Sequence, residues 1–201
     1  MAGKLILMRH GEKADPFALC STGMRRSLAL AEQYLGQGAS KSLFNNGEKP
    51  DAFFAVTLHT LETASPAAQS WRLPVICYSA VPINGSPLGD SPPVLQERTR
   101  QAAADMKARL VLGQIVVAVW EHHCIADPNL AVTLCGSLGL QALIPGKWQG
   151  ENYNYFWIFD YAGGSPTFDK KKQKFDAAFA DLPDNEWGEE MIFPAGSDCE
   201  S

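Results

Sequence analysis

The sequence "LILMRHGEKAD", residues 5–15, runs four apolar residues directly into Arg9 and His10. A short apolar run bounded by polar residues is typical of a strand that is buried on both faces of a parallel sheet. We therefore predict a strand over residues 4–8. Open α/β sheets bind ligands beyond the carboxyl ends of their strands, so Arg9 and His10 become candidate functional residues.

The rest of the chain alternates apolar strands with helices. Further strands are predicted at residues 51–56, 74–78, 114–120 and 153–161, the last with a hairpin partner at 167–175. Helices are predicted at residues 21–35, 60–72, 94–112 and 126–138, with Pro66 near the first turn of the second helix. This order predicts an α/β fold, a three-layer α/β/α sandwich around a mostly parallel central sheet.

The 201 residues fit one domain with its own core, since no repeat or convincing linker interrupts the pattern. We assign residues 1–181 to this single domain. Residues 182–201 are acidic and contain Pro and Gly, and we expect them to form a loose tail.

Composition limits the classes of partner and location. The net charge of −5 argues against a nucleic acid or an anionic membrane as the main partner. No stretch approaches the ~20 apolar residues of a membrane span, and the first residues hold too few apolar positions for a signal peptide. The cysteines are scattered without a C-x-x-C motif, so we expect free thiols in a reducing compartment and a soluble, cytoplasmic protein. The five cysteines are Cys20, Cys77, Cys124, Cys135 and Cys199.

The histidines gather at predicted strand ends. His10 follows the first strand, His59 follows the second, and His122 and His123 follow the fourth. A single histidine after a strand is more often a hydrogen-bonded structural residue. Because the carboxyl ends of parallel strands meet at one edge of a sheet, three such ends together predict a shared functional site.

Three blocks of the sequence resemble the histidine phosphatase superfamily, also called phosphoglycerate-mutase-like. The start of that family, a strand with R-H-G and then Leu-x-x-x-Gly before a helix, is similar to "LILMRHGEKAD" with "LCSTGMRRSLALAEQYL". Its second block, an apolar strand and an R-x-x-x-T-A turn, is similar to "PDAFFAVTLHTLETASPAA". Its fourth-strand block is similar to "VVAVWEHHCIADPNLAVTLCGSLG", with W-E-H where S-H-G is commoner. The resemblance covers residues 4–160 in order and implies a phosphoglycerate-mutase-like fold.

The resemblance implies that His10 is a nucleophile that carries a phosphoryl group, that Arg9 clamps the phosphate and that His122 stabilises the transferring group. The chemistry fits these residue types. A neutral imidazole can attack phosphorus, and guanidinium forks stabilise phosphate oxygens. His123 is expected to be structural. The resemblance implies no metal and no organic cofactor.

One position departs from the family pattern. The second phosphate-clamp arginine lies four residues before the Thr of T-A, and counting back from Thr63 gives His59. Imidazole has a shorter reach than guanidinium and no bidentate fork. His59 can still donate one hydrogen bond to phosphate, so we expect a phosphate pocket that is retained but weakened.

The general acid is left open among several carboxylates. Family members often supply it after the third strand, where a long loop at 79–93 contains Asp90 and Glu97 follows. Glu121, next to His122, is another candidate because a carboxyl group in the site can have a raised pKa. The other arginines are expected to be solvated surface charges: Arg25, Arg26, Arg72, Arg98 and Arg100.

Two functions follow from these observations. The first is a metal-independent phosphatase that acts on a small phosphomonoester through a phosphohistidine at His10, with no nucleic acid or membrane as partner. The alternative is a catalytically weak or inactive member of the same fold that binds phosphate or a similar anion, because His59 replaces the second arginine. The sequence does not choose between a hydrolase and a mutase, and it names neither substrate nor oligomeric state.

Overall fold

The computed structural model describes residues 3–45, 47–80, 93–162 and 165–200, and these contain one sheet of six strands. The strand order is β3-β2-β4-β1-β5-β6. The strands are β1 (Lys4–Arg9), β2 (Ala52–Ala55), β3 (Val75–Cys77), β4 (Ile115–Trp120), β5 (Tyr155–Asp160) and β6 (Thr167–Lys172). The pairs β1–β4, β4–β2 and β2–β3 are parallel, whereas β5 is antiparallel to both β1 and β6. The fold is therefore α/β with a mixed, mostly parallel sheet.

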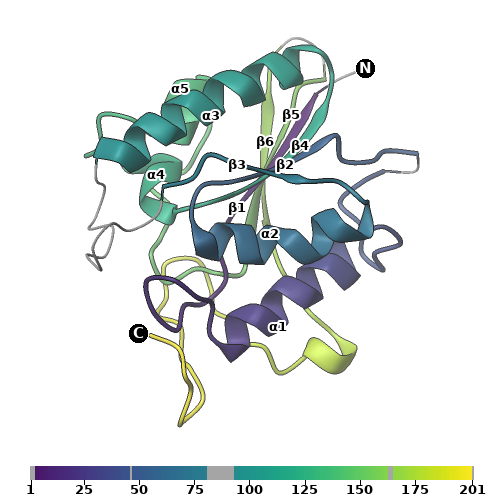
Figure 1. Cartoon of the computed structure of the whole chain (residues 1–201), viewed down its shortest axis with the longest axis vertical. Helices are drawn as coiled ribbons and strands as arrows, with labels where there is room; N and C mark the ends of the chain where they lie inside the picture. Colours follow the sequence, from purple (N-terminus) through teal and green to yellow (C-terminus); the bar gives the residue numbers. More distant parts are fainter. Residues whose placement is uncertain (1–2, 46, 81–92, 163–164, 201) are drawn as a thin grey trace.

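The helices lie on both sides of this sheet. They are α1 (Ser21–Leu30), continued by a π-helical turn η1 (Ala31–Leu35), α2 (Leu58–Ser70), α3 (Pro93–Val111), α4 (His122–Ala126) and α5 (Leu134–Leu138), with a short 3₁₀ turn η2 (Ala177–Phe179). Helices α1 and α2 lie on one side, and α3 and α5 lie on the other (Figure 1). None of the described helices has both the length and the apolar character that a membrane crossing requires.

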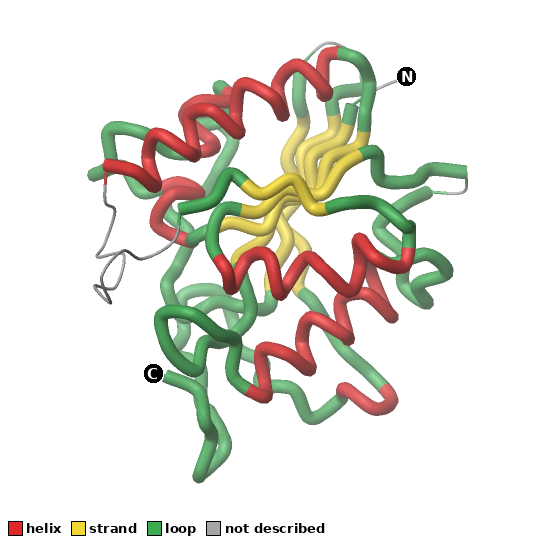
Figure 2. The backbone as a smooth tube through the Cα atoms, in the orientation of Figure 1, coloured by secondary structure: helices red, strands yellow, loops and turns green. Residues whose placement is uncertain are grey.

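Strand β1 is buried on both faces, as its apolar run predicts. Ile6 and Met8 pack with the apolar residues of α1 and α2, whereas Leu5 and Leu7 pack with those of α3. Successive side chains of a strand point to opposite faces, so one strand supplies both cores. Figure 2 shows the strands enclosed between the two sets of helices.

The carboxyl ends of β1 and β4 lie side by side near the middle of the sheet. The register pairs Arg9 with Trp120, the last residues of the two strands. The crossover from β1 leaves through α1 on one side, and the crossover into β4 returns through α3 on the other. Such a reversal opens a crevice at the strand ends in doubly wound sheets.

Two helical predictions need correction. A single helix was expected at 126–138, but α4 ends at Ala126 and α5 begins only at Leu134. Pro128 explains the break, because the residue before a proline is disfavoured in helical conformation, and Asp127 is extended. Pro66 lies inside α2 rather than in its first turn.

The prediction of free thiols is wrong for two cysteines. Cys20 and Cys199 form a disulfide across a sequence separation of 179 residues. The other three cysteines are free, with Cys77 exposed and Cys124 and Cys135 buried. Spacing along the chain does not report a pair that only the tertiary fold brings together. The scattered cysteines therefore give no support for a reducing compartment.

Residues 182–200, expected as a loose tail, lie against the domain in the structure. The Trp187 ring contacts the rings of Trp148, Tyr155 and Trp157, at centroid distances of 5.4, 5.1 and 5.8 Å. The Asn185 side chain donates hydrogen bonds to the carbonyls of residues 151 and 189. These contacts bring the end of the described chain close to the carboxyl ends of the strands.

Candidate active site

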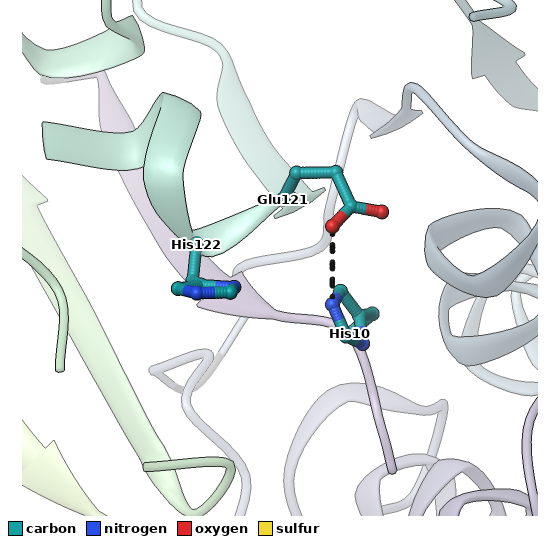
Figure 3. A group of neighbouring side chains, drawn as sticks. All are labelled: His10, Glu121 and His122. Atoms are coloured by element: carbon teal, nitrogen blue, oxygen red, sulfur yellow. Dashed lines mark ion pairs between the residues drawn. The ribbon is translucent and has the colours of Figure 1, made fainter. Parts of the chain in front are cut away.

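The pairing of β1 with β4 brings residues 10, 121 and 122 together. The backbone N–H of His10 lies 3.4 Å from the carbonyl of Trp120, so the chains diverge just beyond this pair. Figure 3 shows His10 at the end of β1, facing Glu121 and His122 at the end of β4. The imidazole centroids of His10 and His122 are 6.4 Å apart, and those of His10 and His59 are 5.6 Å apart.

His10 is held as a neutral imidazole with its two nitrogens in different environments. Its side chain is fully buried, and Nδ1 lies 2.6 Å from the Gly11 carbonyl oxygen. A carbonyl only accepts, so Nδ1 carries the ring hydrogen and Nε2 keeps its lone pair. Burial lowers the pKa of His10 to about 4, although the Glu121 carboxylate acts in the opposite direction. In the neutral ring Nε2 is thus the nitrogen that holds the lone pair needed for nucleophilic attack, and a Glu121 oxygen lies 3.2 Å from it.

The loop that follows His10 is fixed by helix α2. The Gly11 N–H donates to Thr63 Oγ1 at 2.9 Å, and the Thr63 hydroxyl donates to the His59 carbonyl at 2.7 Å. Thr63 is the threonine of the T-A pair singled out in the sequence. Its hydroxyl links the R-H-G loop to α2 and so positions the backbone that carries His10.

Arg9 brings unpartnered hydrogen-bond donors into the site. Its side chain is buried, Nη2 donates to the Tyr153 hydroxyl at 3.0 Å, and the guanidinium carbon lies 3.8 Å from the centre of the Tyr153 ring. Nε and Nη1 are buried without a hydrogen-bond partner among the described residues. Buried N–H groups without partners are costly, and an anion would satisfy them. Burial lowers the pKa of Arg9 from its usual value.

Glu121 sits between three cationic or titratable groups. One oxygen lies 3.2 Å from His10 Nε2 and 3.7 Å from Lys13 Nζ. The other accepts from the Thr57 hydroxyl at 2.7 Å and lies 3.8 Å from His59 Nδ1. Burial alone would raise the pKa of Glu121, but His10, His59 and Lys13 hold it well below its usual range. The pKa is therefore lowered, whereas a general acid would need it raised.

The rings of His122 and His123 lie close together, with centroids 3.8 Å apart, but His122 rather than His123 lines the pocket described below. The Nδ1 atom of His122 is buried without a hydrogen-bond partner among the described residues, and its ring lies beside Gly150. Burial, together with Arg9 and the neighbouring histidines, strongly lowers the pKa of His122. His123 is 40% exposed in its side chain and reaches toward Asp127 on the outer side of α4. His122 is the member of the pair that joins the site.

His59 lies near the site but is turned to a structural partner. Its Nε2 lies 2.8 Å from the carbonyl oxygen of Asp15, and because a carbonyl only accepts, Nε2 donates there. Nδ1 faces Glu121 at 3.8 Å. With both nitrogens directed at protein groups, His59 is not among the residues that line the pocket described below.

Of the other two predicted acids, only Glu97 is among the described residues. Asp90 falls outside the described residues. Glu97 is half-exposed on α3 and forms a salt bridge with Arg100 at 2.6 Å.

The expectation for Arg26 is wrong. Arg26 is 1% exposed and donates to both oxygens of the buried Glu12. Its Nη2 also donates to the Pro183 carbonyl. A buried charge needs a partner because desolvation is costly, and the sequence pattern of α1 gave no sign of that partner.

A pocket of about 230 Å³ opens beside these residues. Its lining consists of Arg9, Lys13, His122, Gly150, Glu151, Tyr153, Phe193 and Glu200. Of these, Arg9 and His122 were predicted from the sequence, whereas Lys13, Glu151, Tyr153, Phe193 and Glu200 were not. A prediction of the Cys20–Cys199 disulfide would have placed the segment that contains Phe193 and Glu200 next to the loop after His10.

The same cluster offers a set of metal donors. Donor atoms of His10, Glu121 and His122 lie within 4.8 Å of one another. Imidazole and carboxylate are suitable ligands for a divalent transition metal. The neighbouring Arg9 and Lys13 would repel a cation, and they suit an anion better.

Comparison with known proteins gives a structural similarity but no family. No family model matches it, and no curated protein matches it. Among solved structures it is similar to one titled "Mycobacterial hydrolase 1", with 14% sequence identity and a TM-score of 0.49 over 87% of this chain and 99% of that one. The resemblance drawn from the three sequence blocks therefore stays a prediction.

Proposed function

We propose that this protein hydrolyses a small phosphomonoester through a phosphohistidine on His10, without a metal. The observation that carries the proposal is the combination of a neutral, buried His10 with two unpartnered N–H donors on the adjacent Arg9, which lines the pocket. The proposal includes membership of the histidine phosphatase superfamily and its three-layer, phosphoglycerate-mutase-like fold.

The first step forms a bond between His10 Nε2 and phosphorus and breaks the ester P–O bond. The leaving oxygen takes a proton from solvent water and departs as an alcohol. Nδ1 keeps its hydrogen, and the Gly11 carbonyl accepts it at 2.6 Å, which steadies the positive charge that develops on the ring. Nε and Nη1 of Arg9 bind the non-bridging oxygens, and His122 faces the same space.

The second step transfers the phosphoryl group to water. A water molecule attacks phosphorus, the N–P bond breaks, and His10 Nε2 recovers its lone pair. The lowered pKa of Glu121 suits a base better than an acid at neutral pH. We assign Glu121 to accepting the proton of the attacking water.

The experiment compares phosphate release from a panel of phosphomonoesters by the wild type and by His10→Ala and His10→Asn. The wild type is expected to release phosphate and to carry an acid-labile phosphoryl group after rapid quenching, and both variants are expected to lack these. Asparagine keeps much of the side-chain volume, and thermal unfolding of both variants checks that the fold persists. Equal phosphate release by wild type and variants would rule out the proposal.

A second candidate function is anion binding with little or no turnover. It is favoured by the hydrogen bond between His59 Nε2 and the Asp15 carbonyl, which leaves Arg9 as the one arginine that lines the pocket among the residues that the structure describes. His59→Arg distinguishes the two functions. A large gain in turnover would indicate a crippled catalyst, whereas tight phosphate binding without such a gain would support a binding role.

A further inference from the structure

The segment of residues 191–200 forms one wall of the pocket. Phe193 and Glu200 line the same cavity as Arg9 and His122. The Phe193 ring contacts the ring of Tyr153 at 6.5 Å, and Tyr153 in turn holds Arg9. The His10 side chain is fully buried beside Arg9 and is not among the lining residues, so displacing this segment would uncover the side of the cavity that lies next to it.

The far end of the segment is fastened to the loop that follows His10. The Cys20–Cys199 disulfide is the covalent link. The carboxylate of Asp198 accepts hydrogen bonds from the backbone and hydroxyl of Ser21, and the Glu200 N–H donates to the Lys13 carbonyl at 2.7 Å. The hydrogen bonds with Ser21 are exposed, so water competes for them.

Between its two ends the segment has few other attachments. Met191 is buried, but Ile192 is 83% exposed. Among the described residues, the ring contact between Phe193 and Tyr153 links residues 192–197 to the rest of the chain. The disulfide is thus the strongest restraint that keeps this wall in place.

We infer that the Cys20–Cys199 disulfide restricts the pocket to small phosphomonoesters and that its reduction opens His10 to larger ones such as a phosphorylated peptide. This inference rests on the proposed function for its substrate class. The structural part of the inference rests on two observations. Phe193 and Glu200 line the pocket, and the Cys20–Cys199 disulfide is the covalent link that holds their segment.

The redox step has a defined balance. A thiolate of a dithiol reductant attacks Cys199, which is half-buried, more readily than Cys20, which is 1% exposed. The S–S bond breaks, the two sulfurs end as thiols, and the reductant supplies two electrons and two protons as it closes to its own disulfide. Disulfides of intracellular proteins, where they occur, are often redox-sensing.

The test uses the oxidised protein, the same protein reduced with dithiothreitol, and the Cys199→Ser variant. The substrates are a small aryl phosphate and a phosphoserine peptide. Reduction and Cys199→Ser are each expected to raise kcat/KM for the peptide, relative to the aryl phosphate, by roughly tenfold. Cys77→Ser is the control, because it removes an exposed free thiol that takes no part in the disulfide. Its ratio of kcat/KM for the peptide to that for the aryl phosphate is expected to match that of the oxidised wild type.

A second readout needs no turnover. Diethyl pyrocarbonate carbethoxylates accessible imidazoles, and peptide mapping reports the rate at His122 in each form. Faster carbethoxylation in the reduced protein and in Cys199→Ser, with no phosphate release from either substrate, would support control of the pocket by the disulfide. The same result would rule out the proposed phosphatase activity. Equal carbethoxylation rates in all forms, with equal ratios of kcat/KM for the two substrates, would rule out control of the pocket by the disulfide, even if the small ester is hydrolysed.

Discussion

Glu121 keeps its negative charge although it is buried, because the Thr57 hydroxyl donates to one of its oxygens and Lys13 Nζ lies 3.7 Å from the other. We assign it to the second half of the reaction, so Glu121→Gln should slow dephosphorylation more than phosphorylation. The expected result is a loss of about 100-fold in steady-state turnover with a larger fraction of trapped phosphoenzyme than in the wild type. Quenched-flow measurement of the phosphohistidine checks this. A variant that forms the phosphoenzyme as slowly as it turns over would instead place Glu121 in the first step.

The buried neutral state of His10 predicts a pH dependence of stability. Its pKa is about 4 in the folded protein and 6.5 as the ordinary value, so between these values the unfolded chain binds more protons than the folded one. The free energy of unfolding therefore falls as pH drops from 6.5 toward 4, and the contribution of His10 is fully present above 6.5. His10→Asn removes that contribution, and the wild type should lose about 3 kcal/mol more than the variant across this window. Urea unfolding at each pH measures the difference, and parallel curves would contradict the assignment of a neutral His10.

At the scale of elements, the approach of the R-H-G loop to α1 depends on two glycines. A Cβ at Gly23 would lie 2.1 Å from the Glu12 carbonyl oxygen, and one at Gly11 would lie 3.0 Å from the Gly23 carbonyl oxygen. Gly23→Ala should therefore destabilise the fold by about 1–3 kcal/mol through overpacking. Chemical denaturation measures this, with Met24→Ala as the control because Met24 is 54% exposed on the same helix. Equal midpoints for the two variants would show that the loop relaxes without cost.

The strands that carry the site could be predicted, because their signal is local. The apolar runs of β1, β2 and β4 end directly before His10, Thr57 and Glu121, and parallel pairing places those ends together. The orientation of His59 could not be predicted, because its partner is the backbone of Asp15 in a loop far from it in sequence. The same holds for Glu12, whose place beside Arg26 depends on how α1 packs.

At the scale of the whole molecule, no local sequence pattern indicated that residues 191–200 would line the pocket. Cys20 and Cys199 are 179 residues apart, and five scattered cysteines allow many pairings or none. Residues 13–20 and 191–200 lie far apart in the sequence, and the tertiary fold places them in contact through the disulfide and the hydrogen bond from the Glu200 N–H to the Lys13 carbonyl. The size of the pocket is therefore a property of the tertiary fold.

The attachment of residues 182–200 has two independent parts, which predicts two separable effects. Trp187 packs against Trp148, Tyr155 and Trp157 before the segment reaches the pocket, and this contact does not involve the disulfide. Trp187→Ala should lower the free energy of unfolding by about 2 kcal/mol or more, by a similar amount in oxidised and reduced protein.

Cys199→Ser should leave the Trp187 contact intact and speed amide exchange in residues 192–200 alone. Chemical denaturation and hydrogen exchange with peptide resolution measure the two effects, and Glu190→Ala, at an exposed position between them, serves as the control. Fast exchange spreading back to Trp187 in Cys199→Ser would show that the disulfide, rather than the tryptophan contact, holds the whole segment. Residues 182–200 would then move away from the pocket as one unit. The pocket would lose Glu151 as well as Phe193 from its lining, because the Asn185 side chain that binds the carbonyl of residue 151 belongs to the same segment.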